Sequence, residues 1–336
     1  MAKEEQLGIG IDFGTSNLLV YVKGYGIIFN EPSVVAFDIE SGEVIAGGYD
    51  ANAMIGKTHS KVIVSRPLQD GVISDMDAAT ALLTYAFQKV KGLKQIQNAV
   101  CMICCPSEVS QIEQEALKEL AEQMGIGEAY IDQEIKSGAI GSGIDIYTPK
   151  AAMIVDIGGG TTDVGVLSLG DVVLSRTIPV AGNYIDQEIM KYLRKQHSLV
   201  IGSGTAERVK IEGGTLSASD GKRKVDVYGR DLITGLPSSA VVTSKALYEL
   251  LLPIFDEIIT AVYSVLEQTP PELAADIVET GITLEGGVSL TPGMQAYFEK
   301  ALGIPVSLAE DPLMAVVAGA KVLLSNKGNY LVVPHE

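Results

Sequence analysis

The chain has 336 residues, of which 47% are hydrophobic, and it carries a formal net charge of -17 at pH 7. Its length allows two domains, and its mean hydropathy of +0.26 excludes a largely disordered protein. The negative charge argues against a nucleic-acid partner and does not favour an anionic membrane. Residues 1–7 lack the basic segment and apolar core of a secretory signal, so we expect a cytoplasmic protein.

The first glycine-rich turn follows an apolar strand at the start of the chain, where residues 8–17 read GIGIDFGTSN. Glycines permit positive φ and let successive backbone N–H groups converge on an anion, while Ser and Thr hydroxyls add further donors. Asp12 stands at the end of the preceding strand. The turn therefore predicts a cradle for phosphate with a carboxylate beside it.

Strands and helices alternate over the rest of the first half. Strands are expected at 21–29, 34–37 and 44–46, and a helix over 77–91. A capping box of Ser110 and Glu113 predicts the start of a further helix that ends at Gly125.

Three cysteines, Cys101, Cys104 and Cys105, lie in one apolar run between these two helices. A metal site would need more ligands, and the three histidines of the chain are remote in sequence. Free cysteine is among the most buried residue types, so we expect thiols inside a buried strand.

The glycine turn recurs in the second half, where residues 152–163 read AMIVDIGGGTTD. Either turn alone is also typical of a β-hairpin, since alternating strands follow at 19–23 and 164–169. The duplication favours two related halves that face one ligand. Asp12 and Asp156 end the two preceding strands, and Mg²⁺ commonly binds through one or two carboxylates. The pair of turns therefore predicts a Mg²⁺-nucleotide.

Two common nucleotide motifs are absent from the sequence. The glycines at 8, 10 and 14 have the spacing GxGxxxG, which differs from the dinucleotide fingerprint, and no GxxxxGK[ST] occurs in the chain. Neither a Rossmann site nor a Walker site is supported.

The second half continues with alternating elements. A helix is expected at 186–196, a polar insert at 202–239, an apolar helix at 244–267 and a strand at 282–284 that leads into a glycine pair. Charged residues and a proline interrupt the apolar helix, so it predicts a core helix and no membrane span. Open α/β sheets bind ligands at the carboxyl ends of their strands, which places the ligand between the halves.

Several further segments carry a family resemblance. They are NEPSVVA at 30–36, RPLQDGVI at 66–73, TAERVK at 205–210, QTPPELA at 268–274 and EDPL at 310–313. Together with the two turns, they make nearly the whole chain similar to the MreB family of bacterial actins. That family belongs to the superfamily of actin, sugar kinases and heat-shock chaperone ATPases.

The resemblance implies an α/β, actin-like fold of two lobes, with duplicated ribonuclease-H-like cores and two smaller inserted subdomains. We expect lobe I over residues 1–146, with its small subdomain at 33–70. Lobe II is expected over 147–310, with its small subdomain at 182–243. The last segment, 311–336, is expected to return to lobe I.

The resemblance also implies ATP or ADP between the lobes, with Mg²⁺ held by Asp12 and Asp156 largely through water. Glu207 and Lys210 would contact ribose or adenine, although such a pair is equally typical of a solvated helix face. Phosphate contacts would come from Gly14, Thr15, Ser16, Asn17, Gly158, Gly159, Gly160, Thr161 and Thr162, with Gly286 and Gly287 beside the adenosine.

For catalysis, the resemblance implies that Glu134 orients or deprotonates the attacking water and that Thr161 helps to hold it. The family usually has Glu-Glu-Pro followed by small or apolar residues, whereas this chain reads QEIKS over 133–137. Lys136 is expected to be exposed or to pair with Glu134, and the altered surroundings of Glu134 predict slow hydrolysis.

Two other segments depart from the family pattern. Gly182 and Asn183 replace the usual Gly-Asp, and LEGGV at 284–288 replaces LTGGG. Valine adopts positive φ far less readily than glycine, so Val288 predicts a tighter or differently shaped loop.

The expected partner is the chain itself, since the resemblance implies head-to-tail polymerisation into paired protofilaments. Paralogous filament proteins are further possible partners. Members of the family bind membranes through an N-terminal amphipathic helix or an apolar loop, but residues 1–7 are short and acidic. The loop at 92–98 offers only Leu93 and Ile96 for a weak peripheral contact at the inner face of the cell membrane. Repetition along a filament would strengthen that contact.

The leading hypothesis is an ATP-binding filament protein whose slow hydrolysis controls polymerisation for cell shape or motility. A nucleotide-bound filament with negligible turnover is an alternative. A small-molecule kinase is another, although no base beyond Glu134 is evident for an acceptor hydroxyl. A chaperone ATPase is disfavoured, because the chain offers no peptide-binding domain after about residue 326. The sequence leaves the choice between ATP and GTP open.

Overall fold

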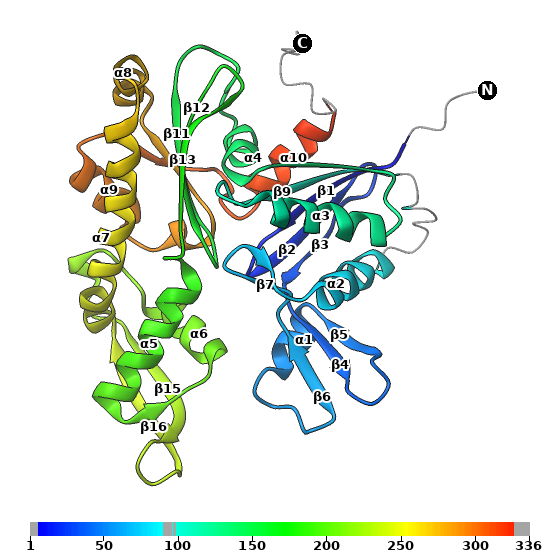
Figure 1. Ribbon diagram of the computed structural model, residues 1–336. Coiled ribbons are helices and arrows are strands. Elements are labelled where there is room, and N and C mark those ends of the chain that lie inside the picture. The colour runs from blue at the N-terminus through cyan, green and yellow to red at the C-terminus, as the bar shows by residue number, and fades with distance from the viewer. Residues whose placement is uncertain (1–5, 90–95, 97–98, 326–336) are drawn as a thin grey trace.

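The computed structural model describes residues 6–89, 96 and 99–325, and it shows two lobes built around five-stranded sheets (Figure 1). The lobe I sheet contains β1 (Gly8–Phe13), β2 (Asn17–Val22), β3 (Gly26–Pro32), β9 (Val100–Cys105) and β10 (Glu128–Gln133). The lobe II sheet contains β11 (Ala152–Ile157), β12 (Thr162–Ser168), β13 (Asp171–Ile178), β17 (Ile282–Glu285) and β18 (Val306–Leu308).

The two sheets have the same connectivity around their glycine turns. The strand orders are β10-β9-β1-β2-β3 and β13-β12-β11-β17-β18. In each sheet, the strand before the glycine turn pairs antiparallel with the strand after it and parallel with a later strand. The two glycine turns therefore lie at equivalent places in the two lobes.

Helices cover both faces of the lobe I sheet. Helices α2 (Met76–Gln88) and α3 (Gln111–Gln123) pack on one face, and α10 (Ala315–Ser325) packs on the other. Strand β9 is buried on both faces, because residues 101, 103 and 105 join the core with α2 and α3 while 100, 102 and 104 join the core with α10. The three cysteines are buried and free, as expected.

Lobe II is covered in a corresponding way. Helix α7 (Ser244–Gln268) packs on one face of its sheet and α4 (Glu134–Gly141) on the other, with α8 (Pro271–Thr280) and α9 (Met294–Leu302) at the outer side. Helices α4 and α10 pack against each other between the lobes (Figure 1). Gly141 lies against the backbone of Ala315 and Gly319 against the backbone of Ser137, so a Cβ on either glycine would overlap main-chain atoms. This helix pair joins the two lobes.

Each lobe also carries a small sheet at the same end of the molecule (Figure 1). In lobe I it consists of β4 (Val35–Asp38), β5 (Val44–Gly47) and β6 (Val62–Ser65) beside α1 (Tyr49–Met54), followed by the hairpin β7 (Leu68–Gln69) and β8 (Val72–Ile73). In lobe II it consists of β14 (Leu199–Val200), β15 (Lys224–Asp231) and β16 (Pro237–Thr243), near α5 (Gly182–His197), α6 (Ser203–Gly213) and the 3-10 helix η1 (Ala218–Asp220). The expected polar insert at 202–239 thus contains a helix and two strands.

One local prediction is confirmed by the structure and another is corrected. The capping box opens α3, since the Ser110 side chain accepts from the Glu113 N–H and the Glu113 side chain accepts from the Ser110 N–H. The helix expected over 77–91 is shorter, because α2 ends at Gln88. Within the described residues, no helix has the length and apolar character that a membrane crossing requires.

Candidate active site

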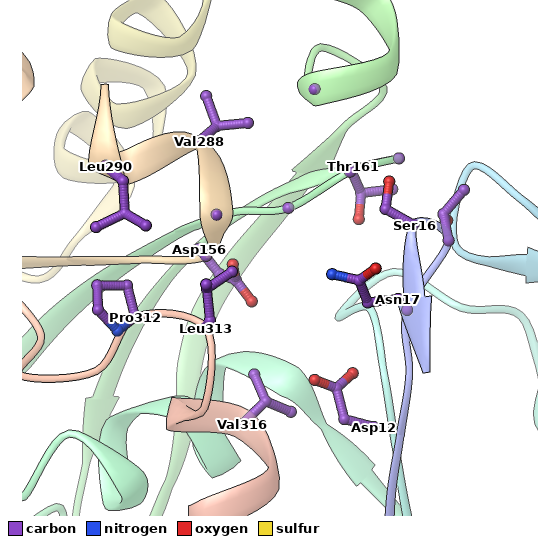
Figure 2. A pocket seen from close by; sticks show the side chains of 18 of the residues that line it. Asp12, Ser16, Asn17, Asp156, Thr161, Val288, Leu290, Pro312, Leu313 and Val316 are labelled. Atoms are coloured by element: carbon purple, nitrogen blue, oxygen red, sulfur yellow. The ribbon is translucent and has the colours of Figure 1, made fainter. Parts of the chain in front are cut away.

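A cleft of about 430 Å³ lies between the lobes where the two glycine turns face each other (Figure 2). The sequence-predicted residues come from segments more than 270 residues apart, yet all except Thr162 line this one cavity. They are Asp12, Gly14, Thr15, Ser16, Asn17, Glu134, Asp156, Gly158, Gly159, Gly160, Thr161, Glu207, Lys210, Gly286 and Gly287.

The two glycine turns approach each other through residues that lack side chains. Gly159 lies against Ser16 and Gly160 against Thr15, and a Cβ on either glycine would overlap the neighbouring hydroxyl. The Thr15 hydroxyl accepts a hydrogen bond from the Gly71 N–H at 2.8 Å. The turns therefore place backbone donors and hydroxyls from both lobes around one space, which suits a polyphosphate.

Asp12 and Asp156 end the strands before the two turns, and their carboxylates point into the same space (Figure 2). Burial raises the pKa of Asp12 to about 7. Burial, followed by the negative charges of Asp163 and Asp12, raises the pKa of Asp156 well above its usual range. A bound cation would relieve both effects.

These two carboxylates fit a magnesium ion that keeps most of its water. The buried Oδ1 of Asp156 has no hydrogen-bond partner among the described residues. No cluster of three or more His, Cys, Asp or Glu side chains able to hold a metal occurs in the described part of the chain. Mg²⁺ usually binds through one or two carboxylates plus phosphate oxygens and water, and the donor set here matches that pattern.

Glu134 is the first residue of α4 and follows β10 directly, so it lies at the end of this edge strand of the lobe I sheet and lines the cleft. It is 9% exposed. Burial, and then the negative charges of Asp12 and Asp163, raise its pKa well above the usual range. A carboxyl group beside the phosphate site can accept a proton from water when it is ionised, and a bound cation would favour that ionised form.

Lys136 is buried, and the expectation of an exposed lysine is wrong. Its side chain is 3% exposed, and its Nζ lies 3.7 Å from Asp132 Oδ2 and 3.4 Å from Asp171 Oδ1. Asp132 belongs to β10 of lobe I and Asp171 begins β13 of lobe II, so Lys136 bridges the lobes. Residues 134–139 are all buried, which leaves this part of α4 without a solvent face.

The sequence analysis missed Asp163, which ties the second glycine turn to lobe I. Its Oδ1 accepts hydrogen bonds from the Ser107 N–H at 2.8 Å and from the Thr177 hydroxyl at 2.7 Å. Burial raises its pKa, and the hydrogen bond from Ser107 opposes that effect. A carboxylate at the start of an otherwise apolar strand was the signal in the sequence.

Thr162 differs from its predicted role. It is fully buried, and its hydroxyl donates to the Val180 carbonyl at 2.6 Å. The phosphate contact expected of this side chain therefore has no support in the structure, whereas its neighbour Thr161 faces the cleft (Figure 2).

The far end of the cleft combines one buried ion pair with an apolar wall. Lys210 Nζ lies 3.0 Å from Asp186 Oδ1 and donates to the Gly182 carbonyl at 3.1 Å, which holds α6 against α5. Burial raises the pKa of Asp186 to about 6, even though Lys210 acts in the opposite direction. The apolar wall consists of Val288, Leu290, Pro312, Leu313 and Val316 (Figure 2). A flat base can pack against such a wall.

Val288 does not need the positive φ that its replacement of glycine brought into question. It lies in the 3-10 helix η2 (Gly287–Leu290), and the positive φ of this segment, 79°, falls on Gly286. The neighbouring departure, Glu285, ends β17 directly beside Asp156 of β11. It is fully buried, and its Oε2 accepts from the Ser142 hydroxyl at 3.1 Å.

The family model described as MreB/Mbl protein matches residues 6–331. The chain belongs to the MreB/Mbl family. The cell shape-determining protein Mbl of Bacillus subtilis is 43% identical over 320 residues, which cover 95% of this chain and 96% of Mbl. The cell shape-determining protein MreB of Escherichia coli is 38% identical over 316 residues, which cover 93% of this chain and 91% of that protein.

Solved structures confirm the actin-like, two-lobed fold of this MreB/Mbl family member. MreB5 of Spiroplasma citri bound to AMPPNP is 42% identical, with a TM-score of 0.93 over 97% of this chain and 98% of MreB5. MamK in a double helical filament is 25% identical, with a TM-score of 0.80 over 96% of this chain and 99% of MamK.

The predicted membrane loop is only partly described. Ile96 is half-buried and packs against the lobe I core, which reduces the apolar surface that it could offer to a membrane. Leu93 lies outside the described residues.

Proposed function

We propose that this MreB/Mbl family member binds Mg-ATP between its lobes and polymerises into filaments that help to determine cell shape. The observation that carries the proposal is the pair of glycine turns that face each other across the cleft, each with a buried carboxylate at the end of its strand. MreB5, which shares the fold over nearly its whole length, has been solved with AMPPNP and with ADP.

In the proposed complex, the backbone N–H groups of the two turns and the hydroxyls of Thr15, Ser16 and Thr161 bind the phosphates. Asp12 and Asp156 would hold Mg²⁺, which when bound neutralises charge that develops on the phosphate oxygens. Lys210 and Glu207 face the sugar, and the apolar wall packs against the base. That wall contains no side chain that selects adenine over guanine, so the preference for ATP rests on the comparison with MreB5.

Hydrolysis would depend on Glu134. Its carboxylate takes a proton from a water molecule whose oxygen attacks the γ-phosphorus, and the bond to the bridging oxygen breaks to leave ADP. Thr161 helps to position that water. Slow turnover is part of the proposal because this chain has QEIKS where the family usually has Glu-Glu-Pro followed by small or apolar residues.

Polymerisation would use repeated head-to-tail contacts, which give an open filament when the rotation between subunits does not close a ring. MamK, which shares the fold, forms a double helical filament, and this supports paired protofilaments. The proposal includes copolymerisation with paralogous filament proteins. It also includes a cytoplasmic location with a weak contact of the Leu93 and Ile96 loop at the inner face of the membrane, strengthened by repetition along the filament.

Sedimentation and phosphate release, measured on the same sample, test this function. The conditions are Mg-ATP, Mg-GTP, AMPPNP and no nucleotide. We expect nucleotide-dependent pelleting with slow phosphate release. Pelleting without any release would favour a filament with negligible turnover. Phosphorylation of an added small-molecule acceptor without pelleting would favour a kinase and refute the filament.

A further inference from the structure

Glu285, which replaces the threonine usual in the family, brings a buried carboxyl group from lobe II against the helix that carries Glu134. Glu285 is 0% exposed at the end of β17, and burial of a carboxylate is unfavourable unless polar neighbours compensate for it. Its Oε2 accepts from the Ser142 hydroxyl, and its buried Oε1 has no hydrogen-bond partner in the part of the chain that the structure describes. Gly138 of α4 and Ser142, which follows that helix, are thus two of its neighbours, and Asp156 of β11 is a third.

Glycine at position 138 makes room for this carboxyl group. A Cβ on Gly138 would overlap Oε1 and the carboxyl carbon of Glu285. Gly138 lies four residues after Glu134, so the two positions are on the same face of α4, one turn apart. The Glu285 side chain thus lies against the helix directly below the residue that faces the phosphates.

We propose that Glu285 is a positioning residue for hydrolysis, which fixes α4 and thereby holds Glu134 at the γ-phosphate. The contact joins the end of a lobe II strand to the face of α4 that carries Glu134, while Lys136 and Ser137 tie the same helix to lobe I strands. When nucleotide binding closes the cleft, the contact of Glu285 with α4 would then fix the position of Glu134. The inference rests on the proposed ATPase function.

Small displacements of a catalytic group reduce turnover strongly, since a shift of about 1 Å can cost on the order of 100-fold in rate. Glu285→Ala removes the contact with Gly138 and the bond from Ser142. We expect kcat for phosphate release to fall at least about tenfold, with the Kd for Mg-ATP within twofold of the unchanged protein. Glu285→Gln keeps the shape and the hydrogen bond and should restore most of kcat. Glu279→Ala, at an exposed residue of α8, is the matched control.

Two further readouts separate positioning from general stability. Amide hydrogen exchange over 134–141 should rise in Glu285→Ala while exchange in α7 stays unchanged. Gly138→Ala should also lower kcat, and the double variant Gly138→Ala with Glu285→Ala should be no slower than the slower single variant, because the two changes act on one contact.

Three results would overturn the proposal. They are an unchanged kcat in Glu285→Ala, a parallel loss of Mg-ATP affinity, or additive effects in the double variant. If the unchanged protein itself releases no phosphate, the ATPase function fails and this inference fails with it. A normal rate in the unchanged protein with an unaffected Glu285→Ala variant refutes only the role of Glu285.

Discussion

The two glycine turns and helix α4 line the same cleft, but different kinds of contact hold them in place. The turns meet through residues without side chains, where Gly159 and Gly160 lie against the hydroxyl residues of lobe I. Helix α4 also meets α10 through close glycine contacts, but it is held in addition by buried polar groups, with Lys136 between two aspartates and Glu285 against Gly138. Nucleotide affinity should therefore depend on the turns, whereas stability and turnover should depend on α4.

The largest expected effect concerns stability. Lys136→Met leaves Asp132 buried beside α4 without this cation, and removing one partner of a buried ion pair typically costs about 3 kcal/mol. We expect a loss of about that size in the free energy of unfolding, measured by urea denaturation. Lys61→Met is the control, because the Lys61–Glu40 pair is exposed, with side-chain exposures of 62% and 70%. Equal stability of the two variants would show that the Lys136 bridge does not stabilise the fold.

A substitution in the second turn should affect binding more than folding. Gly159→Ala places a methyl group where the Ser16 hydroxyl lies, and overpacking of this kind typically costs about 2 kcal/mol. We expect Mg-ATP affinity, measured by fluorescence titration, to fall about 30-fold. Gly204→Ala in α6 meets open space and should bind normally. A normal Kd for Gly159→Ala would mean that the turns need not approach so closely when nucleotide is bound.

Asp163 directly follows the second glycine turn in the sequence, but it is a buried charged group like those around α4. Its substitution therefore tests whether it contributes to nucleotide binding or to stability. Asp163→Ala removes the hydrogen bonds from Ser107 and Thr177. Hydrogen bonds to a charged group contribute about 1.5 to 3 kcal/mol, and we expect only part of this free energy to affect nucleotide binding. We expect Mg-ATP affinity to fall about tenfold and Thr177→Val to show a smaller loss. Unchanged affinity with lowered stability would assign Asp163 to the structural group.

The smallest expected effect is a change in pH dependence at the sugar side of the cleft. The folded-state pKa of Asp186, about 6, is higher than its unfolded value of about 3.8. Between about pH 4 and 6 the folded protein therefore holds a proton on Asp186 that the unfolded chain has released. The stabilising contribution of this proton is complete below about pH 4 and is lost as pH rises through 6. Asp186→Asn should reduce the fall in the free energy of unfolding between pH 4 and 7 by on the order of 1 kcal/mol. Asp226→Asn, at an exposed position of β15, should leave the profile unchanged.

The two turns could be predicted from sequence because their chemistry is local. Glycines, hydroxyls and the strand-ending aspartate follow one another within about ten residues, and duplication of the pattern indicates that they share a ligand. The two-lobed fold followed from the alternation of elements and from the resemblance to the MreB family. The capping box of α3 was predictable for the same reason, since its partners are three residues apart.

Most contacts of α4 could not be predicted in this way, because their partners, apart from Asp132, are distant in sequence. Lys136 is 35 residues from Asp171, and Ser142 is 143 residues from Glu285. A lysine in a short helix is typical of a solvated surface, and only the packing of two sheets and α10 around α4 shows that it is buried. Thr162 was assigned to phosphate for a related reason, since the sequence does not show which of two adjacent threonines faces the core.

The measurement that tests the account most directly is the comparison of Glu134→Gln with the unchanged protein, by phosphate release and sedimentation on the same samples in Mg-ATP. Loss of a positioned general base typically lowers the rate by 100-fold or more. For Glu134→Gln we predict a loss of that size in phosphate release. Nucleotide affinity should be normal and pelleting undiminished, because the turns that bind nucleotide are intact. Phosphate release at the rate of the unchanged protein would contradict the assignment of hydrolysis to Glu134 and its helix.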